Sequence, residues 1–174
     1  MNASHPSLGS SIHGLATRLW PINRSITGEG VRETLRIVKE LLPDLRIHEV
    51  PSGTRVFDWT IPDEWSVREA WIDDPDGRRV VDFAKHNLHL VGYSTAVDKT
   101  LPLQELQEHL HSLPDQPSAI PYITSYYSRR WGFCLRHSDR ERMRPGNYHA
   151  YIDAAHKPGY LTYGELVIPG ASKR

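Results

Sequence analysis

Two segments near the start of the chain carry apolar residues at the three- and four-residue spacing of amphipathic helices. The first covers residues 8–20 and ends at Pro21. The second covers residues 28–42, where apolar steps of four, three and four form the clearest helical pattern in the chain. Thr27 is the predicted N-cap of this second helix, and Pro43 is predicted to end it.

After residue 44 the pattern changes to alternation, which is typical of strands. The stretch Asp74-Pro75-Asp76-Gly77 has proline and glycine at the second and fourth positions, as in a type I turn. We expect residues 45–93 to form a small antiparallel unit with aromatic contacts between strands. Within residues 56–61, one face is predicted to carry Phe57, Trp59 and Ile61. The predicted strands are residues 46–50, 56–61, 67–73, 79–83 and 89–93.

The second half of the chain begins with leucines at steps of three and four, which predict a helix over residues 102–113. A proline-rich loop follows, and the latter half of residues 124–143 has a helical interpretation. Alternating residues then predict strands at 148–154 and 160–168. Because Lys157-Pro158-Gly159 is a turn sequence, these two strands are expected to pair as a hairpin.

Composition narrows the functional classes. The chain has 174 residues, which suffices for one ordinary domain or two small ones, and its 21 basic and 21 acidic side chains cancel. This balance argues against a nucleic-acid-binding protein. No apolar run approaches the roughly 18–20 residues that cross a bilayer, and the first residues lack the features of a secretory signal. The single cysteine suits a reducing compartment, so we expect a cytoplasmic protein without a membrane partner.

The loop RSITGEG precedes the second helix and contains Arg24, Ser25 and Glu29. It is neither a P-loop nor a dinucleotide fingerprint, because the required lysine and glycine spacings are missing. A helix N-terminus attracts anions and Arg24 would assist, whereas Glu29 would repel them. The residues alone therefore favour a helix cap over an anion-binding loop.

An aromatic block contains Tyr122, Tyr126, Tyr127 and Trp131 within ten residues. It is interpreted either as a packed part of the core, which we favour, or as a stacking platform for a sugar or peptide. The second interpretation would make the chain a stand-alone binding module, with neighbouring arginines at positions 129 and 130.

Neither the cysteine nor the histidines form a clear catalytic or metal-binding motif. Cys134 follows the aromatic residues of WGF, which favours a buried, inert thiol. A cysteine enzyme remains the third interpretation, because Arg136 and His137 are near in sequence. No HExxH motif occurs, and the pair at 86/89 lacks an accompanying carboxylate motif. The histidines at 109 and 111 would point about 200° apart on the predicted helix, so they could share one ion only on a strand. We therefore predict no metal ligand in this chain.

Five segments resemble a family of bacterial proteins that contain an aminopeptidase-like domain and have a poorly defined function. In chain order they are LWPINRSITGEGVRETL, PSGTRVFDWTIPDEW, NLHLVGYS, IPYITSYYSRRWGFC and GYLTYGELVIPG, and the resemblance extends from about residue 11 to residue 170. It implies a fold similar to two-metal zinc aminopeptidases, with a small domain inserted near the N-terminus. The expected fold class is thus α+β: residues 1–44 and 138–174 belong to an incomplete aminopeptidase-like core, and residues 45–137 form the inserted domain.

The resemblance also implies a chemistry and its limits. Complete family members are expected to use zinc to hydrolyse an amide bond in a peptide or a modified sugar. Their metal ligands follow the strand that resembles GELVIPG, so no catalytic residue is assigned here and this chain alone is expected to be inactive. Its partners would be such a substrate or the remaining C-terminal portion of a split protein. The candidate substrate-binding residues are Arg24, Ser25, Glu29, Tyr126 and Trp131.

Overall fold

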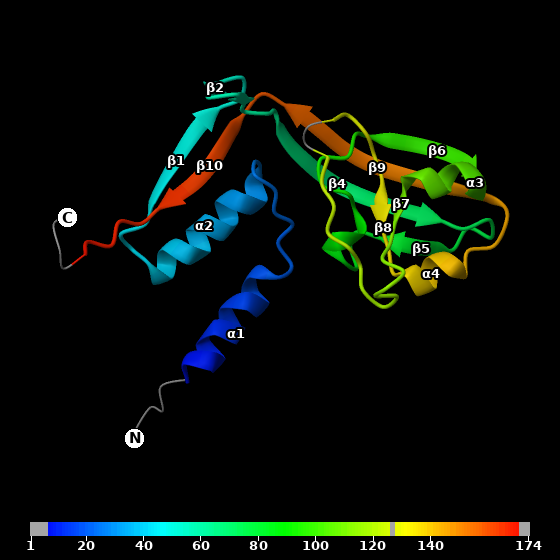
Figure 1. The fold of residues 1–174 in the computed structure, drawn as a ribbon, viewed down its shortest axis with the longest axis horizontal. Helices are drawn as coiled ribbons and strands as arrows, with labels where there is room; N and C mark the ends of the chain where they lie inside the picture. Colours follow the sequence, from blue (N-terminus) through cyan, green and yellow to red (C-terminus); the bar gives the residue numbers. More distant parts are fainter. Residues whose placement is uncertain (1–6, 126–127, 171–174) are drawn as a thin grey trace.

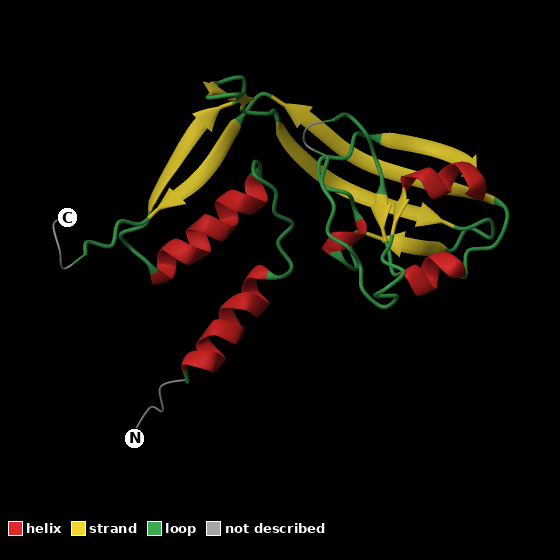
Figure 2. Cartoon of the chain, viewed as in Figure 1, coloured by secondary structure: helices red, strands yellow, loops and turns green. Residues whose placement is uncertain are grey.

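The computed structural model describes residues 7–125 and 128–170, which form an α+β arrangement with mostly antiparallel strands (Figures 1 and 2). This confirms the predicted fold class at that level. The helices are α1 (Leu8–Leu19), α2 (Glu29–Leu41), α3 (Leu103–Leu106) and α4 (His137–Glu141), with 3₁₀ turns η1 (Asn87–His89) and η2 (Gln107–His109). The strands are β1 (Arg46–Pro51), β2 (Arg55–Val56), β3 (Trp59–Thr60), β4 (Glu64–Asp73), β5 (Arg79–Asp82), β6 (Val97–Pro102), β7 (Leu110–His111), β8 (Phe133–Cys134), β9 (Asn147–Lys157) and β10 (Tyr160–Glu165).

A four-stranded antiparallel sheet in the order β5-β4-β9-β6 is the centre of what we call the sheet module, residues 64–157. The long strand β9 pairs with β4 on one side and with β6 on the other. Strands β4 and β5 are joined by the predicted turn, in which the Gly77 amide donates to the Asp74 carbonyl at 2.9 Å. The alternation of β9 buries Tyr148, Ala150 and Ile152 on one face, as its sequence predicted.

The main buried apolar cluster of the described residues lies entirely within the sheet module. Its members come from the strands and from the loops that cross one face of the sheet (Figure 1). They are Trp65, Ala70, Ile72, Val81, Leu90, Tyr93, Val97, Leu101, Leu106, Leu110, Phe133, Leu135, Tyr148, Ala150 and Ile152. Continuous burial of this kind is the main source of folding free energy, so the sheet module contains the core of the chain.

Elements α1, α2, β1 and β10 form what we call the terminal unit, and the short β2–β3 hairpin follows β1 in the chain. Strand β1 pairs antiparallel with β10, and α2 packs against this two-stranded sheet. Leu35 of α2 lies so close to Gly164 that a Cβ there would come within 2.9 Å of the leucine side chain. Helix α1 buries none of its residues and extends away from both sheets (Figure 1).

The pairing of β1 with β10 corrects two predictions. Residues 45–93 do not form one antiparallel unit, because β1 belongs to a different sheet from β4 and β5. Likewise β9 and β10 are not a hairpin. The turn at Pro158-Gly159 is tied to Ser52 by two hydrogen bonds of 2.9 and 3.0 Å, which direct β10 alongside β1. Alternation predicts that a strand exists but does not identify its partner.

The predicted strand over residues 56–61 is also wrong, because the chain turns sharply at Phe57 and Asp58. Val56 pairs with Trp59 across this turn, and Phe57 adopts a positive φ of 57°. Its side chain is 93% exposed rather than sharing a face with Trp59. Residues 89–93 form no regular strand either: they follow η1 and make only the isolated bridges Leu90↔Phe133 and Gly92↔Thr124.

The predicted helix over residues 102–113 is limited to one turn of α3, followed by η2 and β7. Leu106 and Leu110 are both buried, but the chain extends after the second of them so that β7 pairs in parallel with β8. The leucine spacing therefore reflects core positions on two different elements. The helix expected in the latter half of 124–143 is the short α4.

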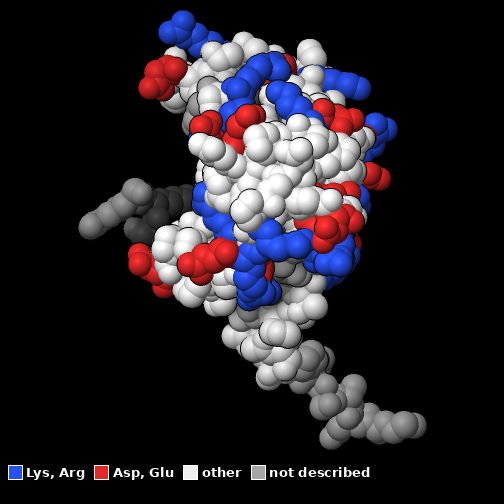
Figure 3. Space-filling model, turned by 90° about the vertical axis from the view of Figure 1, so that its right-hand side faces the viewer, with Lys and Arg blue, Asp and Glu red and all other residues white. Residues whose placement is uncertain are grey.

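Surface charge is mixed. Figure 3 shows basic and acidic side chains intermingled around an uncharged centre, on the face at the end of the sheet module. This matches the overall balance of 21 basic and 21 acidic residues. Among the described residues, no helix is long and apolar enough to span a membrane.

Candidate functional site

The loop before α2 is fixed against the sheet module by Thr27. The backbone N–H of Trp65 donates to the Thr27 hydroxyl at 3.2 Å, and the same hydroxyl is hydrogen-bonded to the Tyr93 hydroxyl. Thr27 is therefore buried, and its predicted role as an N-cap is wrong. The N-cap is Gly28, whose φ of 93° and closeness to the Trp65 carbonyl leave no room for a side chain.

Tyr93 itself has a positive φ of 65°, which is uncommon for a residue with a side chain. Its ring stacks on Trp65 at 5.6 Å between centroids. Backbone strain of this kind persists where surrounding contacts fix it, and here those contacts join the loop before α2 to the sheet module. The junction is consequently well defined on both sides.

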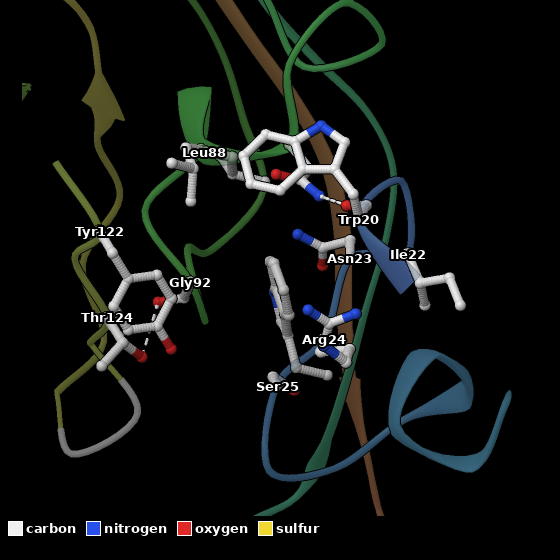
Figure 4. A pocket seen from close by; sticks show the side chains of 12 residues that line it. Trp20, Ile22, Asn23, Arg24, Ser25, Leu88, Gly92, Tyr122 and Thr124 are labelled. Atoms are coloured by element: carbon white, nitrogen blue, oxygen red, sulfur yellow. Dashed lines mark hydrogen bonds between the residues drawn. The ribbon is translucent and has the colours of Figure 1, made fainter. Parts of the chain in front are cut away.

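Beside this junction lies a cavity of about 330 Å³ (Figure 4). Figure 4 shows Asn23, Arg24 and Ser25 on one side, and Tyr122, Gly92 and Thr124 across from them. Asn87 closes one edge by donating from Nδ2 to the Trp20 carbonyl at 2.8 Å. The lining residues are Trp20, Ile22, Asn23, Arg24, Ser25, Trp65, Asn87, Leu88, Leu90, Gly92, Tyr122 and Thr124.

The lining contains one charged side chain, Arg24, and no carboxylate. Arg24 donates from Nη1 to the Leu19 carbonyl, which places the guanidinium at the cavity. Because a guanidinium has five N–H donors, others remain to meet a ligand. Ser25 is partly engaged locally, since its hydroxyl donates to the Thr27 carbonyl at 2.7 Å. The cavity is thus polar with a single positive charge.

Two aromatic rings border the cavity and are largely open to solvent. Trp20 is 57% exposed, and its ring stands at 84° to the ring of His86 with 5.4 Å between centroids. Tyr122 is 68% exposed on the opposite side (Figure 4). Aromatic rings beside polar groups in a concave site are a usual composition of small-molecule sites, and the volume lies at the lower end of their range of about 300–1,000 Å³.

Of the predicted substrate-binding residues, Arg24 and Ser25 line the cavity. Glu29 lies outside it, paired with Arg36 and Arg32 on α2. The hydrogen bond from Arg36, followed by that from Arg32, lowers the pKa of the Glu29 carboxyl.

Of the two aromatic candidate residues, Trp131 is not among the residues that line the cavity. It stacks on His109 at 3.6 Å between centroids and packs against the core. The other aromatic candidate, Tyr126, falls outside the described residues.

Sequence reasoning missed Trp20, Asn23, Asn87 and Thr124 as members of one site. Trp20 and Asn87 are 67 positions apart and meet only through the fold. No local signal in the sequence pointed to Trp20, because the apolar pattern places it on the same side of the predicted helix as the other apolar residues.

Cys134 is fully buried, and burial raises the pKa of its thiol to about 12. A thiol of this kind is protonated at neutral pH, which argues against a cysteine nucleophile. His86 and His89 lie near each other, but His89 Nδ1 is engaged with the Cys134 carbonyl at 2.7 Å. No cluster of three or more histidine, cysteine, aspartate or glutamate side chains that could hold a metal ion occurs within residues 7–125 and 128–170.

Residues 64–155, more than half of the chain, match the sequence model of a family described as a domain of unknown function, DUF2172. The chain belongs to the DUF2172 family. The DUF2172 match begins where β4 begins and ends within β9, so it covers the sheet module except for the end of β9.

Similarity to known proteins extends beyond the DUF2172 segment. Over 162 residues the chain is 46% identical to a Clostridium acetobutylicum protein named "Putative polysaccharide biosynthesis protein with aminopeptidase-like domain". The match covers 93% of this chain but 37% of that protein. A crystal structure of a "putative peptidase" from the same organism superimposes with a TM-score of 0.85 at 46% identity, over 90% of this chain and 37% of that one. The resemblance to aminopeptidase-like proteins is confirmed, and the chain spans little more than a third of the relatives' length.

Proposed function

We propose that this chain is the N-terminal part of a metal-dependent aminopeptidase-like protein, and that it supplies substrate recognition to a hydrolase core. The observation that carries the proposal is the 46% identity to a protein named for an aminopeptidase-like domain, across 93% of this chain. The relatives' remaining length is more than the whole of this chain, which leaves ample room for a catalytic core.

The pairing of β1 with β10 supports an inserted domain. It brings the segment before the sheet module next to the segment after it, as expected where an insertion leaves and re-enters its host domain. The first boundary is better placed after β1 than near residue 45, because β1 pairs with β10 outside the sheet module. The second boundary is better placed after β9 than at residue 137, because β9 lies in the same sheet as β4 and β6. Residues 8–51 and 160–165 would then belong to the aminopeptidase-like core.

The proposed reaction is hydrolysis of an amide bond in a peptide or in an amide-bearing sugar. Zinc would polarise the amide carbonyl and activate water, and its ligands would lie in the part of the relatives that this chain does not match. The residues of this chain would bind and orient the substrate through Arg24 and Ser25 in the cavity. Roles for Glu29, Tyr126 and Trp131 remain proposals, and so does a cytoplasmic location.

The exposed apolar side chains of the terminal unit support the proposal that another part of the protein packs against it. Apolar side chains exposed on α1, α2 and the β1–β10 sheet include Leu8, Ile12, Leu41, Ile47, Tyr160 and Tyr163. Ile12 is 61% exposed on a helix that buries none of its residues. Exposed large apolar side chains on several neighbouring elements are typical of an interaction surface. We propose that the aminopeptidase-like core of the relatives covers it.

A fusion protein tests this proposal. Residues 1–170 of this chain would replace the matching segment of the C. acetobutylicum relative, and release of the amino acid from aminoacyl amides, and of the carboxylic acid from acylated amino sugars, would be measured with zinc. The fusion and the relative should both hydrolyse one of these classes, and the 174-residue chain alone should not. A fusion carrying Ile12→Asp and Leu41→Asp should lose activity, while Arg55→Gln at a surface site should not. Zinc-dependent turnover by the isolated chain would contradict the proposal.

A second candidate, favoured by the cavity beside Tyr122, is a binding module that acts by itself. It differs from the first in one respect: ligand binding would serve no hydrolysis. Binding by the isolated chain, together with an inactive relative and an inactive fusion, would favour this candidate.

A further inference from the structure

The cavity between the loop of residues 20–25 and the sheet module has a composition that selects for a particular ligand chemistry. It has one cation, Arg24, and no carboxylate among its lining residues. A ligand with a positive charge would be repelled, and an uncharged ligand would leave the guanidinium without a counter-charge. A planar carboxylate fits the fork of a guanidinium through two parallel hydrogen bonds, so a single arginine suffices to hold it.

The rest of the lining is suited to a ring that carries several hydroxyl groups. Amide and hydroxyl side chains of Asn23, Asn87 and Thr124 can each donate or accept hydrogen bonds. The exposed rings of Trp20 and Tyr122 offer flat apolar surfaces on two sides of the cavity (Figure 4). A pyranose has C–H bonds on its faces and hydroxyl groups at its rim, which matches aromatic faces with polar groups between them.

Trp20 and the loop that follows it are held in place before any ligand binds. Trp20 is fixed through its carbonyl by Asn87 and through its ring by His86. Two residues beyond Ser25, the loop is anchored by Thr27 to Trp65 and Tyr93. A site that is already ordered loses less entropy on binding, so even a small ligand can gain affinity from these contacts.

We propose that this cavity binds a carboxylate-bearing sugar, such as a uronic acid unit, with the carboxylate on Arg24 and the ring between Trp20 and Tyr122. The inference rests on the recognition role in the proposed function, because it names the ligand class of the same cavity. It does not depend on hydrolysis.

The test uses the full 174-residue chain labelled with fluorotryptophan and observed by fluorine NMR. The chain has five tryptophans, and Trp20→Phe assigns the signal of the one at the cavity. Sodium glucuronate, glucose and sodium acetate are titrated at constant ionic strength. Glucuronate should shift the Trp20 signal saturably and leave the signals of the half-buried Trp59 and Trp71, which do not line the cavity, far less affected. Glucose should bind at least about tenfold more weakly, since it lacks the charge-assisted hydrogen bonds.

Two arginine variants distinguish binding of glucuronate in the cavity from non-specific electrostatic attraction of the anion to the protein. Arg24→Gln should weaken glucuronate binding by about tenfold or more. Arg55→Gln is the matched control, because Arg55 is also exposed and also donates to a backbone carbonyl, that of Phe57, away from the cavity. The signals of the other tryptophans report whether each variant is folded.

The proposal is overturned if glucuronate leaves the Trp20 signal unchanged. It is also overturned if acetate shifts that signal as much as glucuronate does, or if Arg24→Gln and Arg55→Gln have equal effects. Saturable glucuronate binding combined with an inactive fusion would support this inference and reject the proposed hydrolase role, so the two can fail separately.

Discussion

The sheet module and the terminal unit have opposite distributions of apolar side chains. In the sheet module, the apolar residues of β4, β9 and the covering loops meet in one buried cluster. In the terminal unit, α2 buries Ile37 while α1 buries nothing and leaves Ile12 at the surface. Burial as extensive as that in the sheet module supports independent folding. Exposure of apolar side chains as in the terminal unit is typical of a surface that another part of a protein covers. The difference teaches that one chain can contain a region with its own buried core beside a region that leaves many apolar side chains at the surface.

The largest expected effect is a difference in the free energy of unfolding when isoleucine is replaced by alanine in each of the two regions. Ile72→Ala removes a fully buried side chain from the centre of the sheet module and should lower the free energy of unfolding by about 2–5 kcal/mol. Ile12→Ala removes an exposed side chain from α1 and should change it by less than about 0.5 kcal/mol. Urea unfolding followed by tryptophan fluorescence measures both. Equal losses would show that α1 is part of the core after all.

A smaller effect is expected at the junction between the regions. Thr27→Val keeps the shape of the side chain but removes the hydroxyl that accepts from the Trp65 amide, and should cost about 1–3 kcal/mol. The control is Thr17→Val on α1, where the exposed hydroxyl donates to the His13 carbonyl. It should have little effect. A Thr27→Val protein as stable as the unsubstituted chain would mean that the junction does not depend on this hydrogen bond.

The smallest expected effect is the pH dependence of the stability of the sheet module, to which the buried His89 contributes. Burial lowers the pKa of His89, although its contact with the Cys134 carbonyl opposes the shift, and the nearby charges come from His86, Arg136 and Asp139. Because the folded-state pKa lies below the unfolded one, the unfolded chain takes up the proton first on acidification. The contribution of the neutral His89 to the free energy of unfolding should therefore be fully present above the unfolded-state pKa of about 6.5. It should be lost as the pH falls from there through the folded-state pKa of His89.

Replacement of His89 by Gln should flatten this dependence in urea unfolding measured across that pH range. The same replacement at His13, which is exposed on α1, should leave the dependence as it is in the unsubstituted chain. If both variants keep the same slope, the buried imidazole does not contribute to it.

The sequence predicted the positions of the strands along the chain better than it predicted which strands pair with each other. The alternation in β4 and β9 located both strands, since each has one face in the core. It could not indicate that β9 pairs with β4 and β6 while β10 pairs with β1, because strand partners depend on the whole fold. The turn at Phe57 was missed because its aromatic and β-branched surroundings favour a strand, and local propensity gave way to the hairpin.

The candidate site shows the same limit. Arg24 and Ser25 became candidates through the resemblance to aminopeptidase-like proteins, since the residues alone favoured a helix cap over an anion-binding loop. Thr27 was assigned to the helix end, but a buried amide of Trp65 uses its hydroxyl instead. Trp20 and Asn87 could not be connected from sequence, because only the packing of the loop against the sheet module brings them together.

Hydrogen exchange measured by mass spectrometry tests the central claim most directly, that a folded recognition domain is joined to an uncovered part of a hydrolase core. For the isolated chain, amides of β4 and β9 should exchange slowly and those of α1 rapidly. In the fusion with the remainder of the C. acetobutylicum relative, α1, α2 and β10 should become protected while β4 and β9 stay unchanged. Protection of α1 equal to that of β4 in the isolated chain, or no added protection in the fusion, would contradict the account.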